Sequence, residues 1–231
     1  MSLRVKASLE RLLQRSRRKV FCIGANKTGT TTMEHVLRSL GYRMGDQFRA
    51  ESQITRKILE GQSKEFIAYC KTADAFQDVP FSLHDVYVAA DVFFPGSRFI
   101  LTVRDPGEWF DSMCRFHQKL FGITDLSRIT EVDVRDKFMP HVPGLSHYLT
   151  SKALYNTVGG EDFVDWRKLY DKAWYCEKFE QRNLRIKRYF SNRPEDLLVM
   201  DITQEHDTSR IVRFLDLPDD LVARMPHANR T

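Results

Sequence analysis

The segment at residues 24–32, with the sequence GANKTGTTT, has residue types suited to binding an anion. An apolar run at residues 20–23 precedes it and predicts a buried strand, and the apolar residues between 33 and 40 are spaced like one face of a helix. In a loop that joins a strand to a helix, backbone N–H groups converge at the helix N-terminus, which favours phosphate or sulfate. Gly24 and Gly29 let such an anion approach the backbone closely.

The lysine of this loop is displaced from the place that the Walker A pattern gives it. Walker A has lysine directly after the second glycine, whereas here Thr30 follows Gly29 and Lys27 lies three residues earlier. A lysine at that place reaches the mouth of the loop, where a bridging oxygen of a ligand would lie, rather than the β- and γ-phosphates of a nucleoside triphosphate. The alternative is an ordinary strand-to-helix turn rich in glycine and threonine.

A second set of polar residues follows the apolar run at residues 98–103, which predicts another strand. Asp105 and Glu108 have the spacing of an N-cap and its capping box, and a proline takes the first helical position. Arg104 is then expected at the carboxyl edge of the sheet, and Ser112 in the second turn of the next helix. An arginine in a surface ion pair and a serine on a solvated helix face are the alternative interpretation.

The remaining patterns predict an α/β fold with a central, mostly parallel sheet flanked by helices. Further strands are expected at 73–78 and 197–200, and a short edge strand at 42–44. Helices are expected at 52–72 with a break near Gly61, and at 83–94, 162–190 and 208–217. Open α/β sheets bind ligands at the carboxyl ends of their strands, so both polar motifs should face one crevice.

Both motifs resemble those of the sulfotransferases that use 3′-phosphoadenosine 5′-phosphosulfate (PAPS). K-T-G-T-T is similar to their 5′-phosphosulfate loop, and Arg104 with Ser112 in VRDPGEWFDS fits the spacing of their 3′-phosphate motif. The C-terminal PHANRT also resembles the P-H-x-N tail of a bacterial branch, although its role is open. The resemblance spans residues 20–229 and implies a single domain over residues 1–231 with a three-layer P-loop NTPase-like fold.

The resemblance implies transfer of a sulfuryl group from PAPS to a hydroxyl or amine of an acceptor, with release of adenosine 3′,5′-bisphosphate (PAP). Such a reaction depends on positioning and electrostatic stabilisation, and Lys27 would neutralise charge on the bridging oxygen. The residues expected to hold the nucleotide are Lys27, Thr28, Gly29, Thr30, Thr31, Arg104 and Ser112. The acceptor, a small molecule or a glycan, is not specified by the sequence.

The sequence does not identify the general base, because it matches neither the glutamate nor the histidine pattern of the sulfotransferases closely. Asp78 and His84 are the candidates that follow the predicted strand at 73–78. Asp78 should face the crevice and is slightly favoured, whereas the ordinary pKa of a histidine such as His84 suits neutral pH. A turn-forming aspartate and a plain surface histidine are the alternatives.

Two other classes of function stay open at this point. A P-loop kinase or NTPase with a degenerate loop would bind ATP with Mg²⁺, but Thr30 takes the position of its lysine. A non-catalytic nucleotide-binding protein would bind PAP without turning over any acceptor.

Composition fits one α/β domain of ordinary polarity. The chain has 231 residues, 42% hydrophobic and 29% charged, with a net charge of +5 and four widely spaced cysteines. The basic residues are scattered, so nucleic acid is not expected as a partner, and neither a zinc site nor any other metal is predicted. No membrane span or signal peptide is recognisable, so we expect a cytoplasmic protein with a basic helix at 1–18 and an acceptor-binding or lid segment at 121–160.

Overall fold

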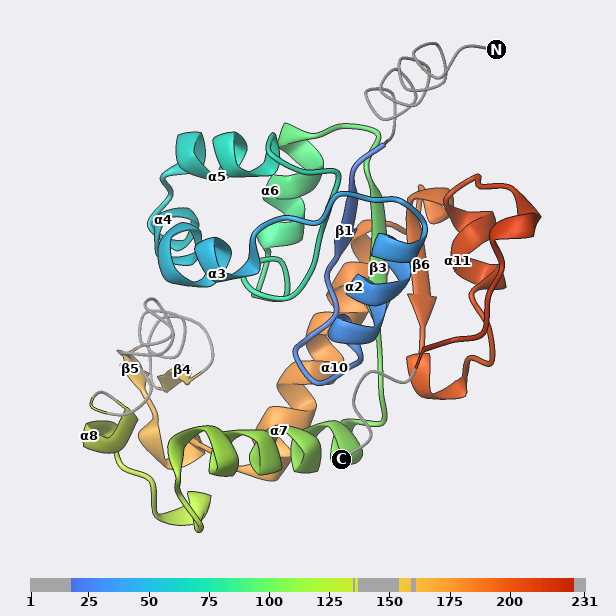
Figure 1. The fold of residues 1–231 in the computed structure, drawn as a ribbon. Coiled ribbons are helices and arrows are strands. Elements are labelled where there is room, and N and C mark those ends of the chain that lie inside the picture. Colours follow the sequence, from blue (N-terminus) through green and yellow to red (C-terminus); the bar gives the residue numbers. More distant parts are fainter. Residues whose placement is uncertain (1–17, 135, 137–153, 159–160, 227–231) are drawn as a thin grey trace, which may run out of the picture.

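Four parallel strands form the central sheet of the molecule (Figure 1). Their order across the sheet is β2-β1-β3-β6, and Phe21 of β1 lies in register with Phe76 of β2 and Phe99 of β3. The strands are β1 (Val20–Cys22), β2 (Ala75–Phe76), β3 (Arg98–Thr102) and β6 (Leu197–Met200). The predicted parallel sheet is confirmed, although β2 is shorter than the strand expected at 73–78.

This structure, a computed structural model, describes residues 18–134, 136, 154–158 and 161–226. Apart from Arg18, the basic helix expected at 1–18 lies outside the described residues. The same holds for residues 135, 137–153 and 159–160 of the acceptor-binding or lid segment expected at 121–160, and for the end of the tail, residues 227–231.

Helices cover both faces of the sheet, which confirms the three-layer arrangement. α2 and α11 pack on one face, and α5, α6 and α10 on the other. The longer helices are α2 (Thr30–Ser39), α5 (Ser63–Cys70), α6 (Val86–Phe93), α7 (Pro106–Phe121), α10 (Lys172–Tyr189) and α11 (Ser209–Phe214). The shorter ones are α3 (Gln47–Arg49), η1 (Ala50–Ile54), α4 (Thr55–Leu59), η2 (Leu126–Arg128), α8 (Glu131–Asp133), η5 (Trp166–Lys168), η6 (Pro194–Asp196), η7 (Ile202–Gln204) and η8 (Asp219–Leu221).

Within the described ranges, we find no helix with the length and apolarity needed to cross a bilayer.

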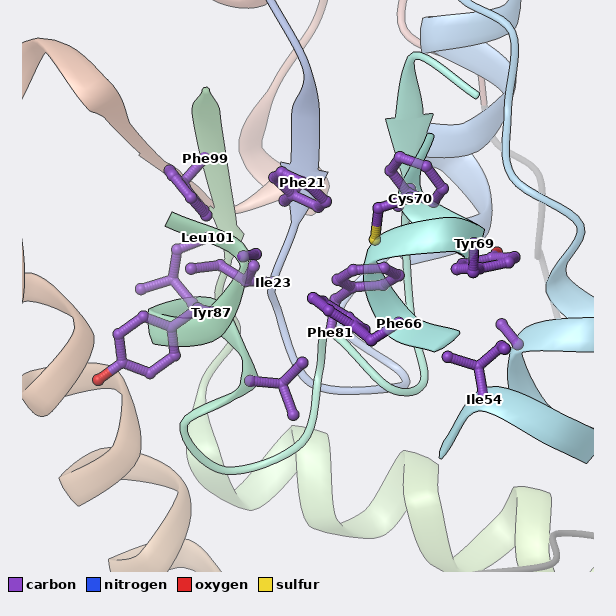
Figure 2. Packing of buried hydrophobic residues seen from close by; sticks show 14 of the residues in the cluster. Phe21, Ile23, Ile54, Phe66, Tyr69, Cys70, Phe81, Tyr87, Phe99 and Leu101 are labelled. Carbon is purple, nitrogen blue, oxygen red and sulfur yellow. The ribbon is translucent and has the colours of Figure 1, made fainter. Parts of the chain in front are cut away.

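Alternation along β1 divides the core into two parts. Successive side chains of a strand point to opposite faces, so Val20 and Cys22 pack with α2 and α11 while Phe21 packs with the helices of the opposite layer. Aromatic rings fill that second part (Figure 2). The Phe21 ring has its centroid 5.2–5.5 Å from those of Phe76, Phe81 and Phe99. This packing fixes the level at which β1 ends and the following loop begins.

The single helix predicted at 162–190 is wrong in its first ten residues. β5 (Glu161–Val164) pairs there with β4 (Tyr155–Val158) in an antiparallel hairpin, and η5 follows. Tyr170 has φ of 59°, which a helix does not accommodate, and the Asp171 side chain then accepts the Trp174 N–H to begin α10. The aromatic residues of this stretch resembled a helix face because short strands and turns can share its spacing.

Smaller differences also have local causes. At 42–44 the chain forms a single bridge, Met44 to Ala75, instead of an edge strand. The helical region predicted at 52–72 is broken at Gly61, which has φ of 79°, as expected. At the start of α7, Asp105 accepts the Glu108 N–H, but the reciprocal half of the capping box is replaced by an ion pair of Glu108 with Arg104.

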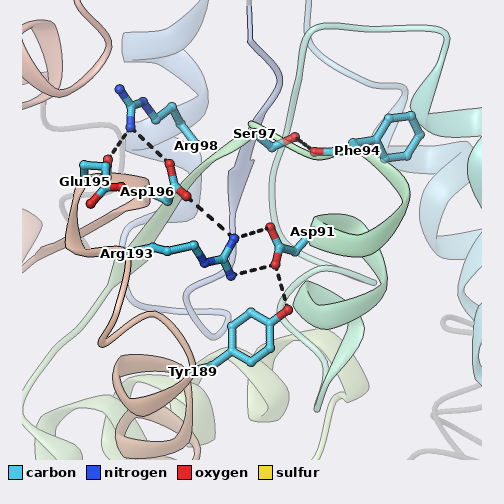
Figure 3. A network of polar contacts seen from close by, with 8 residues as sticks. All are labelled: Asp91, Phe94, Ser97, Arg98, Tyr189, Arg193, Glu195 and Asp196. Carbon is cyan, nitrogen blue, oxygen red and sulfur yellow. Dashed lines mark hydrogen bonds and ion pairs between the residues drawn. The ribbon is translucent and has the colours of Figure 1, made fainter.

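A polar network joins the amino-terminal edge of the sheet to α6 and α10 (Figure 3). Arg193 donates to both carboxylate oxygens of Asp91, at 3.1 and 2.7 Å, and the Tyr189 hydroxyl donates to the same group at 2.7 Å. Asp196 pairs with Arg193 at 3.6 Å and with Arg98 of β3 at 3.2 Å. Burial would raise the pKa of Asp91, but these hydrogen bonds lower it below its ordinary value. The network therefore stabilises the charged carboxylate between the layers.

We expect Arg193→Ala to destabilise the fold by about 2 kcal/mol, because it leaves the Asp91 carboxylate buried without its cationic partner. Urea unfolding at pH 7 measures the change. Arg188→Ala, at an exposed position of α10, is the control and should change the free energy of unfolding by less than about 0.5 kcal/mol. Equal effects of the two substitutions would contradict the structural role of the network.

Candidate functional site

The loop at residues 24–29 leaves the sheet where its connections diverge. From β1 the chain passes to β2 on one side, and from β2 it crosses over to β3 on the other side of β1. Open α/β sheets form their ligand crevices at such a switch point, beyond the carboxyl ends of the strands. The two motifs singled out in the sequence follow β1 and β3, so the structure places both of them at the same edge of the sheet.

The loop enters α2 through a glycine of positive φ. Gly29 has φ of 101° and precedes the first turn of α2, where no acidic side chain is present. A Cβ atom at Gly29 would lie 3.0 Å from the Ile202 side chain, a tight contact, and the positive φ would strain any other residue at this position. The N–H groups at the start of α2 have no partners within the helix and suit phosphate or sulfate oxygens.

Thr102 of β3 fixes the position of the loop. A Cβ atom at Gly24 would lie 1.9 Å from Thr102 Oγ1, so the two backbones approach as closely as glycine allows. The Thr28 hydroxyl forms two hydrogen bonds. It donates one to Ala25 O at 2.6 Å and shares the other with the Thr102 hydroxyl, also at 2.6 Å. Sequence reasoning missed Thr102, although a polar residue at the end of an apolar run was a usable signal.

Two side chains from other helices also hold the loop. Trp109 of α7 donates its indole N–H to Asn26 O at 2.9 Å, and its ring stacks on Phe179 at 4.3 Å. Arg182 of α10, which is buried, donates to Ile23 O at 2.9 Å, directly before Gly24. Neither contact had a signal in the sequence, because both residues read as parts of ordinary helix faces.

Lys27 lies close to charges of both signs. Its ammonium lies 4.6 Å from the centroid of the Phe116 ring, within the range of a cation–π interaction. Burial lowers its pKa; Asp78 opposes this shift, and Arg104 and Arg115 add to it. The structure thus brings Lys27, Asp78 and Arg104, predicted from separate segments, into one electrostatic neighbourhood.

Asp78 lies beside the first turn of α2. Thr30 donates its hydroxyl to Asp78 Oδ2 at 3.2 Å, and Ser82 donates to Oδ1 at 3.4 Å. Burial, followed by the nearby charge of Glu51, raises the pKa of Asp78 to about 6 against the hydrogen bonds from Thr30, Val79 and Ser82. A carboxylate in this state can accept a proton close to neutral pH. The hydroxyls of Thr30 and Thr31 were both expected to help to bind a phosphate. In the structure the Thr30 hydroxyl is bound to Asp78, and Thr31 is exposed.

Beyond the carboxyl end of β3, Arg104 lies in the segment that leads to α7, and Ser112 lies within α7. The Arg104 guanidinium pairs with Glu108 at 3.3 Å, an exposed contact of small energetic weight that an anion can replace. Ser112 lies two turns into α7, as predicted, and no hydrogen bond joins its hydroxyl to another part of the described chain. His84, the second candidate base, is paired with the neighbouring Asp85 carboxylate.

His117 of α7 is a further residue that sequence reasoning missed. Its Nδ1 atom lies 2.7 Å from the Tyr170 hydroxyl. Burial and the charge of Lys27 lower the pKa of His117 to about 4, which keeps the imidazole neutral at physiological pH.

Comparison with known proteins agrees with this geometry. The family model described as "Sulfotransferase domain" matches residues 19–231. The chain belongs to the sulfotransferase domain family. Among solved structures, a sulfotransferase from Alicyclobacillus acidocaldarius is similar at 13% identity with a TM-score of 0.51, covering 93% of this chain and 87% of the other. No curated protein sequence matches the chain.

Family membership supports sulfotransfer as the activity of this chain, and the solved sulfotransferase supports its P-loop-like α/β fold. Lys27 and Arg104 both contribute positive charge close to the loop.

In this sulfotransferase, Gly24→Ala should displace the loop, because the new methyl group would overlap Thr102. We expect the free energy of unfolding, measured by urea titration, to fall by about 1–3 kcal/mol. We also expect the binding of inorganic pyrophosphate, measured by calorimetry, to be lost. Gly107→Ala is the matched control, since its Cβ would lie no closer than 3.3 Å to any neighbour. Pyrophosphate binding that survives Gly24→Ala would contradict this placement of the anion site.

The raised pKa of Asp78 predicts a pH-dependent effect on the stability of this sulfotransferase. In the folded protein the pKa of Asp78 is about 6, above its ordinary value of 3.8, so ionisation of Asp78 destabilises the fold. This destabilisation is complete above pH 6 and absent below pH 3.8. Asp78→Asn should therefore raise the melting temperature at pH 8 and leave it nearly unchanged at pH 4. Asp220→Asn, at an exposed position of η8, should show no such difference. A melting temperature lowered at pH 8 would refute the assignment.

Proposed function

We propose that this protein transfers a sulfuryl group from PAPS to an acceptor hydroxyl or amine and releases PAP. The observation that carries the proposal is the position of Lys27 within the loop, beside the Phe116 ring. The position that a lysine occupies in the Walker A pattern is held here by Thr30, which is hydrogen-bonded to Asp78. A nucleoside triphosphate with Mg²⁺ would need a lysine where this chain has a threonine that already engages a carboxylate.

The nucleotide would be held at its two charged ends. Backbone N–H groups at residues 28–31 would bind the 5′-phosphate at the N-terminus of α2. Arg104 would exchange Glu108 for the 3′-phosphate, on which its planar guanidinium can form two hydrogen bonds, and Ser112 would add a third.

In the transfer step, the acceptor oxygen or nitrogen forms a bond to sulfur while the bond between sulfur and the bridging oxygen breaks. The electron pair of the broken bond stays on the 5′-phosphate of PAP, where Lys27 stabilises the growing charge. Asp78 would take the acceptor proton, because its carboxylate is ionised above pH 6 and retains affinity for a proton. Its Thr30 hydrogen bond would keep the carboxylate beside the phosphosulfate group.

Calorimetry of the full chain with PAP and adenosine 5′-monophosphate tests the nucleotide site. PAP should bind about 10- to 100-fold more tightly, without added metal, because Arg104 binds the 3′-phosphate. Arg104→Ala should remove this difference and leave the affinity for the monophosphate almost unchanged.

The control is Arg128→Ala, an exposed arginine of η2 that should preserve the preference for PAP. Tighter binding of ATP with Mg²⁺ than of PAP, or a 3′-phosphate without effect on the wild type, would refute the proposal in favour of a kinase-like site.

A further inference from the structure

We propose that the amino-terminal edge of the sheet binds the surface of a membrane that contains anionic lipids. In this arrangement the turn at residues 92–96 enters the lipid, and the basic segment at residues 1–19 contacts the lipid headgroups. This edge lies opposite the one that carries the proposed nucleotide site, so the inference does not depend on the proposed sulfuryl transfer.

An exposed apolar turn lies at this edge of the sheet. Residues 92–96, with the sequence VFFPG, contain no charged side chain and lead from the end of α6 toward β3. Val92 is 64% exposed and Phe93 37%, and Pro95 and Gly96 are exposed as well. A Cβ atom at Gly96 would meet no atom of the described chain within 4 Å. Apolar residues that are consecutive in the chain and exposed together are typical of surfaces that meet a partner.

The turn is held in one conformation by its own hydrogen bonds. Gly96 has φ of 79°, as the third position of a type II turn requires, and a proline precedes it. The Ser97 N–H and the Ser97 hydroxyl both donate to Phe94 O, at 3.2 and 2.5 Å (Figure 3). A turn that is already ordered loses little conformational entropy when it binds.

The start of β1 lies beside this turn. Arg18 and Lys19 line the same surface hollow as residues 93–97. The Lys19 ammonium lies 5.4 Å from the centroid of the Phe94 ring and donates to Ala73 O at 2.7 Å. The connection from α6 to β3 and the start of β1 are at one end of the sheet, whereas α7 is at the other (Figure 1). The basic segment therefore joins the folded domain next to the apolar turn.

The basic segment contains the excess positive charge of the whole chain. Residues 1–19 have seven arginines and lysines and one glutamate, whereas the full sequence has 36 basic and 31 acidic residues. Basic and acidic side chains are thus nearly balanced in residues 20–231. Within the segment, Val5, Leu9, Leu12 and Leu13 have the spacing of one helix face. Basic sequences with one apolar face are typical of segments that bind anionic membranes.

A lipid surface uses both features, whereas nucleic acid or another polyanion uses only one. Headgroups of anionic lipids attract the basic segment, and the apolar region beneath them accepts Val92 and Phe93. A polyanion in water would leave these two side chains exposed. Bound in this way, the protein would keep the loop after β1 accessible, because that loop is at the carboxyl ends of the strands.

Sedimentation of the full chain with lipid vesicles tests the inference. The vesicles consist of phosphatidylcholine alone or of phosphatidylcholine with about 30% phosphatidylglycerol. We expect the partition coefficient to be at least about tenfold higher for the anionic vesicles, because about 1 kcal/mol is gained per basic residue near such a surface. Raising NaCl from about 0.1 to about 0.5 M should lower it at least about tenfold, because salt screens the attraction.

Val92→Asp tests the apolar turn. The side chain is mostly exposed, so the fold should tolerate the substitution, and binding to anionic vesicles should fall by about tenfold or more because a charge would have to enter the lipid. The matched control is Val132→Asp on α8, which is 57% exposed and lies at the other end of the molecule. This variant should bind like the wild type.

The double substitution Arg15→Ala/Arg17→Ala tests the basic segment. Loss of two charges should weaken binding to anionic vesicles by about 25-fold. Lys119→Ala/Arg128→Ala, at exposed positions of α7 and η2, removes the same charge elsewhere and should have less than about a twofold effect.

The inference is overturned if the chain binds neither kind of vesicle or binds both equally well. It is also overturned if Val92→Asp has no effect while the double arginine variant loses binding, because the edge would then be a site for a soluble polyanion. The affinity for PAP, measured without vesicles, is a separate result: its absence would overturn the proposed function and leave this inference standing.

Discussion

The contact between Gly24 and Thr102 is the constraint on which the site depends. Because glycine has no side chain, the loop after β1 lies directly against the end of β3, and the Thr28 and Thr102 hydroxyls join the two segments. This contact sets the distance between the anion-binding turn and Arg104, which comes two residues after Thr102. Trp109 and Arg182 then fix the loop from the two neighbouring helices. The site is therefore rigid where the two strands meet.

Rigidity of this kind lets the fold hold groups that a flexible site would expose to water. Asp78 has positive φ, lies among protein atoms and has a pKa raised to about 6, so its ionised form costs stability. The cost is local, because the aromatic packing around Phe21 and the network around Asp91 stabilise the layers independently of the site. On the proposed function, the same burial that penalises the charge makes the carboxylate a stronger base.

The sequence predicted the parts of the fold that depend on local patterns. The strand at Val20–Cys22, the loop and α2 form a continuous signal, and Asp105 with Pro106 marked the start of α7 correctly. The start of α10 was missed because aromatic residues near Phe163 suit a hairpin and a helix equally well, and only pairing with β4 decides between them. Thr102, Trp109 and His117 were missed as site residues for the same reason, since each acts through a contact distant in sequence.

α7 differs between its two halves. Its N-terminal half is constrained by the buried residues Trp109, Phe110 and Met113, and Trp109 holds the loop. In its C-terminal half, Phe116 and Leu120 are exposed, whereas His117 is hydrogen-bonded to Tyr170. A substitution at an exposed position of that half such as Leu120 would leave the loop and the core intact. Relatives and engineered variants are therefore expected to differ at such positions of the helix without loss of the fold.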